Sequence, residues 1–553
     1  MKALIDQLIR ESSASYLEAK SLAAAELPEF DLTISKDVNH GDFATNVAFK
    51  LSKLCRQNPK TIAEELTSLM VEKTKRENKT QVKKIEVAGG GFINFYLAKD
   101  SIAQILMDVR KQDRDFGRSQ YGKGEKVLLE FVSANPTGPL TIAHGRQAAI
   151  GDSLKRILIF CGFQVASEYY LNDGGRQMNL LGLSLLARYR EALGMAEPLP
   201  EDGYQGEYLK DIAAQLVKEK GDSIQKMPAK DAADFCRKYA GETIMKGIRQ
   251  DLHDSDVQFD SYYSEQTLYQ GKIEEVFEVL KHGGFLFEKE GALWFESTRF
   301  GDDKDRVVRK STGECTYLAP DIAYHHEKFK RGFARLINLL GPDHHGYIAR
   351  LNAACQALGH DSSALRVLIV QLSTLYRKGQ AVRMSTRAGE FVTLRELLDE
   401  VGKDATRFFF VSRKIESHID FDLDLAKSKS QENPVFYLQY AHARIASLLK
   451  FASQEIPESI DAALLASDEE RSLIKKIAEF PDTLISASEG LEPYRLVDYL
   501  MELSACFHKF YSAHRIVTDD GNMTKARLML SDATRIVLRN GLGLLGVSQP
   551  ESM

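Results

Sequence analysis

The stretch LLEFVSANPTGPLTIAHGRQAAIGDSL, residues 128–154, decides the fold of the middle of this chain. An apolar run ends in Glu130, a turn broken by proline and glycine follows, and His144 stands at the start of a helical pattern. A buried strand leading through such a turn into a helix is a unit of a doubly wound parallel sheet. Ligands bind beyond the carboxyl ends of such strands, so the sequence predicts a binding site at this turn.

Strands and helices alternate on the C-terminal side of this unit. Residues 164–171 read as the next strand and 175–190 as the next helix, and strand patterns return at 334–347. We therefore expect a multidomain α/β protein with a Rossmann-like catalytic domain over residues 122–375. Residues from about 196 to 300 are more helical and charged, which predicts a helical insertion.

The two ends of the chain carry different patterns. Residues 1–110 combine helical periodicity with short strand-like runs, including one on each side of three glycines in IEVAGGGFINFYL. This alternation predicts a small α/β domain. Helical periodicity prevails over residues 426–553 with no convincing strand, which predicts an all-helical bundle.

Composition limits the class of protein. The chain has 553 residues and a formal net charge of −5, which argues against wholesale nucleic-acid coating but allows one local basic contact. Its six cysteines are scattered without a C-x-x-C pair, so we expect a reducing cytoplasm and neither a zinc ribbon nor disulfides. The start, MKALIDQLIRESSASYLEAK, is too charged for a signal peptide, and no apolar run is long enough to span a bilayer.

His144 falls in the first turn of the expected helix. Free backbone N–H groups and the helix dipole attract phosphate at such a position. A histidine there can donate a hydrogen bond to an α-phosphate as charge builds during a displacement. On this residue alone, the alternative is a capping or core histidine.

Several separate segments resemble one family. SANPTGPLTIAHGRQAAIGD closely resembles the HIGH signature of class I aminoacyl-tRNA synthetases, in its arginyl-tRNA synthetase version. EYYLNDGGRQMNLL, TYLAPDIAYH and GPDHHGYIARL resemble catalytic segments of that family, and RMSTRAGEFVTLRELLDEVGKDATRFFF resembles its second signature loop. NHGDFATNVAFKL and GGGFINFYL are similar to its N-terminal domain, and FHKFYSAHRIV and LRNGLGLLGV to its anticodon-binding bundle. The blocks occur in family order over nearly the whole chain.

The resemblance implies a reaction and its partners. The expected reaction is ATP-dependent attachment of L-arginine to its cognate tRNA(Arg) through an arginyl-adenylate, with tRNA needed even for activation. Mg²⁺ is expected to accompany ATP, and no zinc is expected. The N-terminal domain is expected to meet the outer corner of the tRNA, residues 376–425 to hold the second signature loop and stem contacts, and 426–553 to bind the anticodon. We expect a cytoplasmic monomer without membrane contact.

The resemblance also implies an arginine pocket. A planar, permanently charged guanidinium needs carboxylates and hydrogen-bond acceptors. Asp321 is assigned to the guanidinium with Tyr317 beside it, because residues four apart on a helix face the same way. Glu130 and Asn135 are assigned to the α-amino end, and a helix N-cap after Pro320 is the alternative for Asp321. The expected substrate-binding set is Glu130, Ser133, Asn135, Gln177, Tyr317 and Asp321.

The nucleotide side of the expected site comes from both signatures. GPDHHGY offers Asp343, His344 and His345, but no third metal ligand at suitable spacing is visible, and the resemblance instead places His344 against the nucleotide. The ATP-binding set implied by the family is Gly145, His344 and Met384. The catalytic set is His144, Thr141, Arg383, Ser385 and Arg387.

Both signatures depart from the family pattern. The first normally has histidine at both ends, but here Thr141 stands at the first position. Losing one charge-assisted contact in the transition state costs about 2–4 kcal/mol unless another group substitutes. The second has Thr386 in place of its final lysine, with Arg383 and Arg387 supplying positive charge nearby. These departures leave a rival hypothesis: a catalytically impaired synthetase-like protein that binds tRNA or regulates.

The C-terminal helices interleave aromatic with basic or histidine residues, a combination that can stack bases and meet phosphate. Tyr511 and His508, in FHKFYSAHR, are the best candidates for tRNA contacts. The alternative for each is packing in the helical core.

Overall fold

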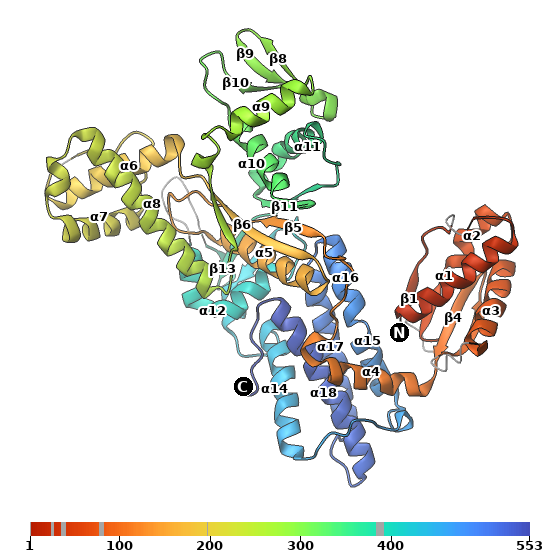
Figure 1. Ribbon diagram of the computed structural model, residues 1–553. Helices are drawn as coiled ribbons and strands as arrows, with labels where there is room; N and C mark the ends of the chain where they lie inside the picture. Colours follow the sequence, from red (N-terminus) through yellow and green to blue (C-terminus); the bar gives the residue numbers. More distant parts are fainter. Residues whose placement is uncertain (1, 24–26, 35–39, 77–81, 196, 383–391) are drawn as a thin grey trace.

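The computed structural model has three parts: an N-terminal domain, a central catalytic region and a C-terminal helical bundle (Figure 1). This order is the one that the sequence predicts. The structure describes residues 2–23, 27–34, 40–76, 82–195, 197–382 and 392–553. No helix in these described ranges is both long enough and apolar enough to cross a membrane.

The N-terminal domain is a small α/β unit with its own hydrophobic core. Its four-stranded antiparallel sheet has the order β1-β2-β4-β3. Figure 1 shows it at one side of the molecule, where α4 leads into the rest of the chain, and an ion pair between Asp42 and Lys475 of the C-terminal bundle (2.9 Å) gives a second connection. Its elements are α1 (Lys2–Ala19), β1 (Leu32–Ile34), β2 (Phe43–Thr45), α2 (Val47–Cys55), α3 (Pro59–Arg76), β3 (Val82–Ala88) and β4 (Phe92–Leu97), followed by α4 (Lys99–Gln112).

A five-stranded parallel sheet organises the catalytic region, in the order β12-β11-β5-β6-β7. The chain runs from β5 outward to β6 and β7, and later returns on the other side of β5 with β11, so the strand order reverses at β5. Residues Val127–Glu130 are buried, as expected for a central strand covered on both faces. The strands are β5 (Lys126–Glu130), β6 (Gln164–Leu171), β7 (Ser261–Ser264), β11 (Arg335–Leu340) and β12 (Leu365–Ile369).

Helices connect these strands and extend the region. Helix α5 (Ile142–Phe160) follows β5, and α6 (Gly175–Ala192), α7 (Glu207–Lys220) and α8 (Ala229–Asp254) form a helical lobe after β6. The stretch 196–300 also contains β7, the edge strand of the main sheet, so it is more than a helical insertion. The remaining elements are α9 (Lys272–His282), the antiparallel β8 (Leu286–Lys289), β9 (Ala292–Phe295) and β10 (Arg306–Arg309), α10 (Leu318–Lys330), the 3-10 turn η7 (Pro342–Tyr347) and α11 (Ile348–Ala357).

A small module joins the sheet to the bundle. Helix α12 begins after Thr393, which forms an isolated antiparallel bridge with Thr141. The start of α12 is therefore paired with the turn that precedes α5. The elements are β13 (Ser373–Arg377), β14 (Gln380–Ala381), α12 (Leu394–Val411), β15 (Ile419–Asp422) and α13 (Leu423–Lys427).

The C-terminal part is helical, and the described residues after β15 contain no strand. Arg407 of α12 connects this bundle to the catalytic region through a guanidinium with 1% side-chain exposure. It donates to Asp152 Oδ2 of α5 (2.5 Å), to the Leu545 carbonyl after α18 (2.9 Å) and to the Ser255 carbonyl (2.9 Å). The helices are α14 (Pro434–Ala452), α15 (Asp468–Ala478), α16 (Phe480–Gly490), α17 (Tyr494–Ala513) and α18 (Gly521–Leu544).

Candidate active site

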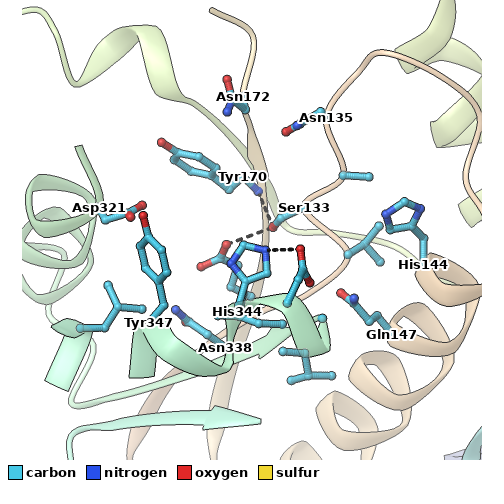
Figure 2. Close-up of a pocket in the computed structure, with 18 of the residues that line it drawn as sticks. Ser133, Asn135, His144, Gln147, Tyr170, Asn172, Asp321, Asn338, His344 and Tyr347 are labelled. Atoms are coloured by element: carbon cyan, nitrogen blue, oxygen red, sulfur yellow. Dashed lines mark hydrogen bonds and ion pairs between the residues drawn. The ribbon is translucent and has the colours of Figure 1, made fainter. Parts of the chain in front are cut away.

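A cavity of about 530 Å³ lies at the carboxyl ends of the central strands (Figure 2). Its walls come from the turn after β5, the first turn of α5, the start of α10 and η7. This is the point where the strand order reverses and where such sheets bind ligands. Of the residues predicted from sequence, the cavity brings together Glu130, Ser133, Asn135, His144, Tyr317, Asp321 and His344.

The turn after β5 has an uncommon backbone. Val132 and Ser133 have φ values of 68° and 41°, in the left-handed region that side chains disfavour. Such positions cost about 1–3 kcal/mol each and cluster at functional sites. Ser133 Oγ accepts the backbone N–H of Tyr170 (3.1 Å) and donates to Glu130 Oε1 (3.0 Å). The strained turn is therefore fastened to the neighbouring strand β6.

Glu130 ends β5 with 6% exposure and has a buried partner that sequence reasoning missed. Its Oε2 accepts a hydrogen bond from Lys328 Nζ at 2.5 Å, and Lys328 is completely buried. Lys328 also donates to Asn338 Oδ1 (3.2 Å). Both oxygens of Glu130 are thus engaged before any substrate arrives.

Asp321 differs sharply from Glu130. It is the fourth residue of α10, whose N-cap position is Tyr317, so the N-cap alternative for Asp321 is wrong. No side-chain hydrogen bond or ion pair of Asp321 is found among the residues that the structure describes. Burial raises its pKa to about 8, and repulsion from Glu130 and Glu265 adds to the shift. Figure 2 shows Asp321 and His144 on opposite walls of the same cavity.

A third carboxylate, Glu265, was not predicted. It follows β7 and lines the cavity near Asp321. Burial raises its pKa as well, partly offset by a hydrogen bond from Tyr170. The only signal in the sequence would have been recognition of β7, whose pairing with β6 brings this turn to the site.

Tyr317 lies one helical turn before Asp321 and is 78% exposed. It belongs to the rim of the cavity rather than to its floor. Because the two residues are four apart on one helix, the phenol ring can cover a group bound to the carboxylate.

Gln177, predicted to bind the substrate, contacts Asn135 instead of lining the cavity. The side-chain amide of Asn135 donates to Gln177 Oε1 at 2.6 Å, so Gln177 supports the pocket without lining it. Asp173 accepts the Ser264 hydroxyl at 2.6 Å and thereby ties the end of β6 to the end of β7. Asn135 lines the cavity, and the oxygen of its side-chain amide remains available to accept a hydrogen bond from a ligand there.

His144 stands in the first turn of α5 and its tautomer follows from its contacts. The backbone N–H of Thr141 donates to His144 Nδ1 at 3.2 Å, which makes Nδ1 an acceptor and leaves the proton on Nε2. Burial lowers the pKa of His144 to about 4, so the ring is neutral at pH 7. A neutral imidazole with Nε2–H is a hydrogen-bond donor for a ligand in the cavity.

Thr141 begins α5 and turns its hydroxyl toward His144, with Oγ1 at 3.2 Å from Nδ1. It does not line the cavity, and neither does Gly145. A Cβ at position 145 would lie 2.7 Å from a methyl group of Leu394, so this glycine permits close packing of α5 on α12. Both residues therefore stabilise the start of α5 without lining the cavity.

His344 lies in η7 and lines the cavity with a partly exposed ring, 3.5 Å from Asp343. The described residues contain no group of three His, Cys, Asp or Glu that could hold a metal ion. The predicted Arg383, Met384, Ser385 and Arg387 lie outside the described residues.

The two predicted tRNA contacts lie on α17, and both are partly buried. His508 packs against the rings of Tyr437 (4.9 Å between centroids) and Tyr440, and burial lowers its pKa to about 4. Tyr511 lines a surface groove of about 340 Å³. Arg444 lies 4.7 Å from the centre of its ring, and Phe451 at the same groove is 79% exposed.

Comparison with known proteins assigns each part of the chain. Residues 101–419 match the family described as "tRNA synthetases class I (R), catalytic domain". Residues 2–97 match "Arginyl tRNA synthetase N terminal domain", and 438–553 match "DALR anticodon binding domain". The fold and the site thus define a class I aminoacyl-tRNA synthetase.

Individual relatives narrow the class to one family. The chain is 46% identical to the arginine–tRNA ligase of Desulfosudis oleivorans over 561 residues, covering 100% of both chains. It is 46% identical to arginine–tRNA ligase 1 of Halalkalibacterium halodurans, covering 99% of both. The solved arginyl-tRNA synthetase of Thermus thermophilus has the same fold, with a TM-score of 0.78 at 22% identity and full coverage of both chains. The chain belongs to the arginyl-tRNA synthetase family.

Proposed function

We propose that this protein uses ATP to attach L-arginine to its cognate tRNA through an arginyl-adenylate. One observation carries the proposal: Asp321, a partly buried carboxylate with no hydrogen-bond or ion-pair partner among the described side chains, faces the same cavity as the His144 imidazole. A buried carboxylate is costly unless a cation pairs with it. The guanidinium of arginine is such a cation.

The amino acid is bound at two ends. Asp321 and Glu265 receive the guanidinium, with Tyr317 closing over it, and Glu130 and Asn135 receive the α-ammonium. A lysine ammonium cannot match the planar, several-donor geometry of a guanidinium and leaves acceptors unpaired. Citrulline has the shape but lacks the charge that Asp321 requires.

The reaction takes place between these ends and His144. A carboxylate oxygen of arginine attacks the α-phosphorus of ATP in line. The bond between this phosphorus and the oxygen that bridges the α- and β-phosphates breaks, and pyrophosphate leaves. The Nε2–H of His144 and the free N–H groups of the first turn of α5 stabilise the charge that builds on the α-phosphate. A hydroxyl of the terminal ribose of tRNA then attacks the carbonyl carbon, and AMP leaves. Mg²⁺ enters as part of the ATP substrate complex.

The second signature and the nucleotide-binding residues complete the assignment. Arg383, Ser385 and Arg387 are proposed to hold the pyrophosphate, and Met384 and His344 to contact ATP. Gly145 contributes through the packing of α5.

Thr141 takes over a supporting role at the position of the missing histidine. Its backbone N–H and its hydroxyl both contact Nδ1 of His144. These contacts leave the proton on Nε2, which is proposed to donate to the phosphate. The rival hypothesis of an impaired tRNA-binding relative gives no reason for Asp321, a carboxylate with no bonded partner among the described residues, on the cavity wall opposite His144.

The tRNA is proposed to place its anticodon at the C-terminal bundle, with Tyr511 in the groove and His508 supporting the neighbouring rings. The N-terminal domain meets the outer corner of the tRNA. Activation requires the tRNA, so arginine-dependent pyrophosphate exchange should stay near background without it. The protein is proposed to act as a monomer in the cytoplasm.

Aminoacylation of arginine tRNA by the purified protein tests the function. We expect robust charging by the wild type and a kcat about 100- to 1000-fold lower in His144→Ala, the usual cost of removing one transition-state donor. Thr141→His should change kcat by less than about tenfold, because His144 is already held. A wild type that binds tRNA but charges none would favour the rival hypothesis.

A further inference from the structure

Lys328 is a buried cation behind the wall of the amino-acid pocket. It lies on α10 two turns after Asp321, has no exposed surface and does not line the cavity. Its ammonium donates to Glu130 Oε2 at 2.5 Å and to Asn338 Oδ1 at 3.2 Å, and it lies 4.1 Å from the ring centre of Tyr324. All three of these partners line the cavity.

Stability alone does not account for this ion pair. Removing two charges from water costs several kcal/mol per ion, and well-packed apolar residues in place of a buried pair are often equally stable. A lysine kept in this position therefore suggests a role in the site that its partners form.

The pocket contains three carboxylates, and Lys328 bonds to one of them. Glu130, Asp321 and Glu265 all line the cavity, and the first two repel each other across it. Lys328 compensates Glu130 directly and leaves Asp321 without a bonded cation among the described residues. The two ends of the pocket thereby differ: Glu130 is held in place by Lys328, whereas Asp321 can pair with a cation of the substrate.

The bonds around Glu130 also fix its direction. Lys328 holds Oε2, while Ser133, itself fastened to the backbone of Tyr170, holds Oε1. A carboxylate has about four acceptor sites, so Glu130 can still accept hydrogen bonds from a substrate. Without the lysine, Glu130 would keep only its hydrogen bond from Ser133, and its buried charge would lack a counter-ion.

We propose that Lys328 is a positioning residue: it is the counter-ion of Glu130 and fixes that carboxylate in the pocket wall, where it can accept the α-ammonium group of arginine. The inference rests on the proposed function and adds a residue that acts through Glu130 without touching the substrate.

Two fragments of arginine separate this role from a general structural one. Agmatine keeps the guanidinium and the ammonium but lacks the carboxylate, whereas 5-guanidinopentanoate keeps the guanidinium and the carboxylate but lacks the ammonium. Calorimetric titration of the full chain with each fragment is the measurement. Lys328→Met should weaken agmatine binding about tenfold or more, the worth of a charge-assisted hydrogen bond, and change 5-guanidinopentanoate binding less than about twofold. Equal weakening of both fragments would overturn the inference.

A double-mutant cycle keeps the test decisive if the single variant is unstable. In a Glu130→Gln background no buried carboxylate remains to be held, so adding Lys328→Met should weaken agmatine less than about twofold further. An equal loss in both backgrounds would show that Lys328 does not act through Glu130.

A matched control lies on the same helix. Lys330 is partly exposed and pairs with Glu275, so Lys330→Met should leave the binding of both fragments unchanged. Failure of the proposed function would look different, because wild-type protein would then bind neither L-arginine nor agmatine more tightly than L-lysine.

Discussion

The two ends of the amino-acid pocket, Glu130 and Asp321, carry the same functional group in opposite states. Glu130 is bonded to Lys328 and Ser133, whereas Asp321 has no bonded partner among the described side chains. Glu130 is buried and Asp321 is partly buried in the wall of the cavity, so the main difference lies in the partners that each has nearby. The fold supplies Glu130 with a cation, Lys328, whereas the substrate is proposed to supply the cation for Asp321.

This difference separates two ways of binding the same molecule. A carboxylate that already has a cation gains little charge compensation from a ligand but offers a fixed direction. A carboxylate without one gains a large compensation from a guanidinium and rejects neutral ligands. We therefore expect specificity to come mainly from Asp321, and orientation of the reacting carboxylate of arginine to come from the Glu130 end.

The largest effect is expected for Asp321→Asn, which keeps the shape and removes the charge. The kcat/KM for arginine in aminoacylation should fall about 100- to 1000-fold, because the guanidinium loses one of its two carboxylate partners and keeps only Glu265. The melting temperature should stay the same or rise, since a costly buried carboxylate has gone. A fall in activity below tenfold would mean that another group pairs with the guanidinium.

Glu130→Gln should weaken binding of the α-ammonium and, in addition, lower the stability of the fold. It leaves Lys328 charged and buried without a counter-ion, which costs about 3 kcal/mol of unfolding free energy. Urea titration followed by circular dichroism measures this loss. Equal stability of the Glu130→Gln and Asp321→Asn variants would contradict the view that only Glu130 is paired with a buried cation in the free protein.

The pH dependence of arginine binding should also follow Asp321. Burial, with repulsion from Glu130 and Glu265, puts its pKa at about 8 in the free protein, and only the ionised form pairs with a guanidinium. Arginine stays cationic over pH 6–8, so its affinity should weaken about tenfold for each pH unit below 8, with release of a proton on binding. Calorimetry in buffers of different ionisation enthalpy measures both, and Asp321→Asn, which has no such proton to release, should show a shallower profile.

The smallest effect is expected at the rim. Tyr317→Phe removes one exposed hydroxyl beside Asp321 and should raise the KM for arginine about threefold with little change in kcat, because an exposed hydrogen bond contributes about 0.5–1 kcal/mol. Steady-state aminoacylation kinetics can resolve the two parameters. A large fall in kcat would place Tyr317 in the reaction itself rather than at the rim.

Sequence alone predicted the framework because local patterns determine it. The apolar run before Glu130, the broken turn and the helix at His144 are contiguous, so the first unit of the sheet and the site at its end could be inferred directly. Asp321 and Tyr317 came from a separate segment and required the family resemblance. The strand β7 was missed because Ser261–Ser264 is short and lacks apolar alternation.

The parts of the site that were missed depend on tertiary placement. In the segment EKFK, Lys328 has the appearance of a solvated helix position, and only the packing of α10 against β5 and β11 buries it. Glu265 reaches the pocket only because β7 pairs with β6. Neither position has a local pattern that distinguishes it from an ordinary charged surface residue.

The guanidinium of Arg407 has a consequence for how the molecule is assembled. It joins Asp152, 255 residues earlier, to the Leu545 carbonyl, 138 residues later, so three distant stretches meet at one buried charge. Closing contacts so far apart in sequence is slow and comes late in folding. During translation, nearly all of this sequence must therefore leave the ribosome before Arg407 can join α5, the helix that carries His144, to the Leu545 carbonyl.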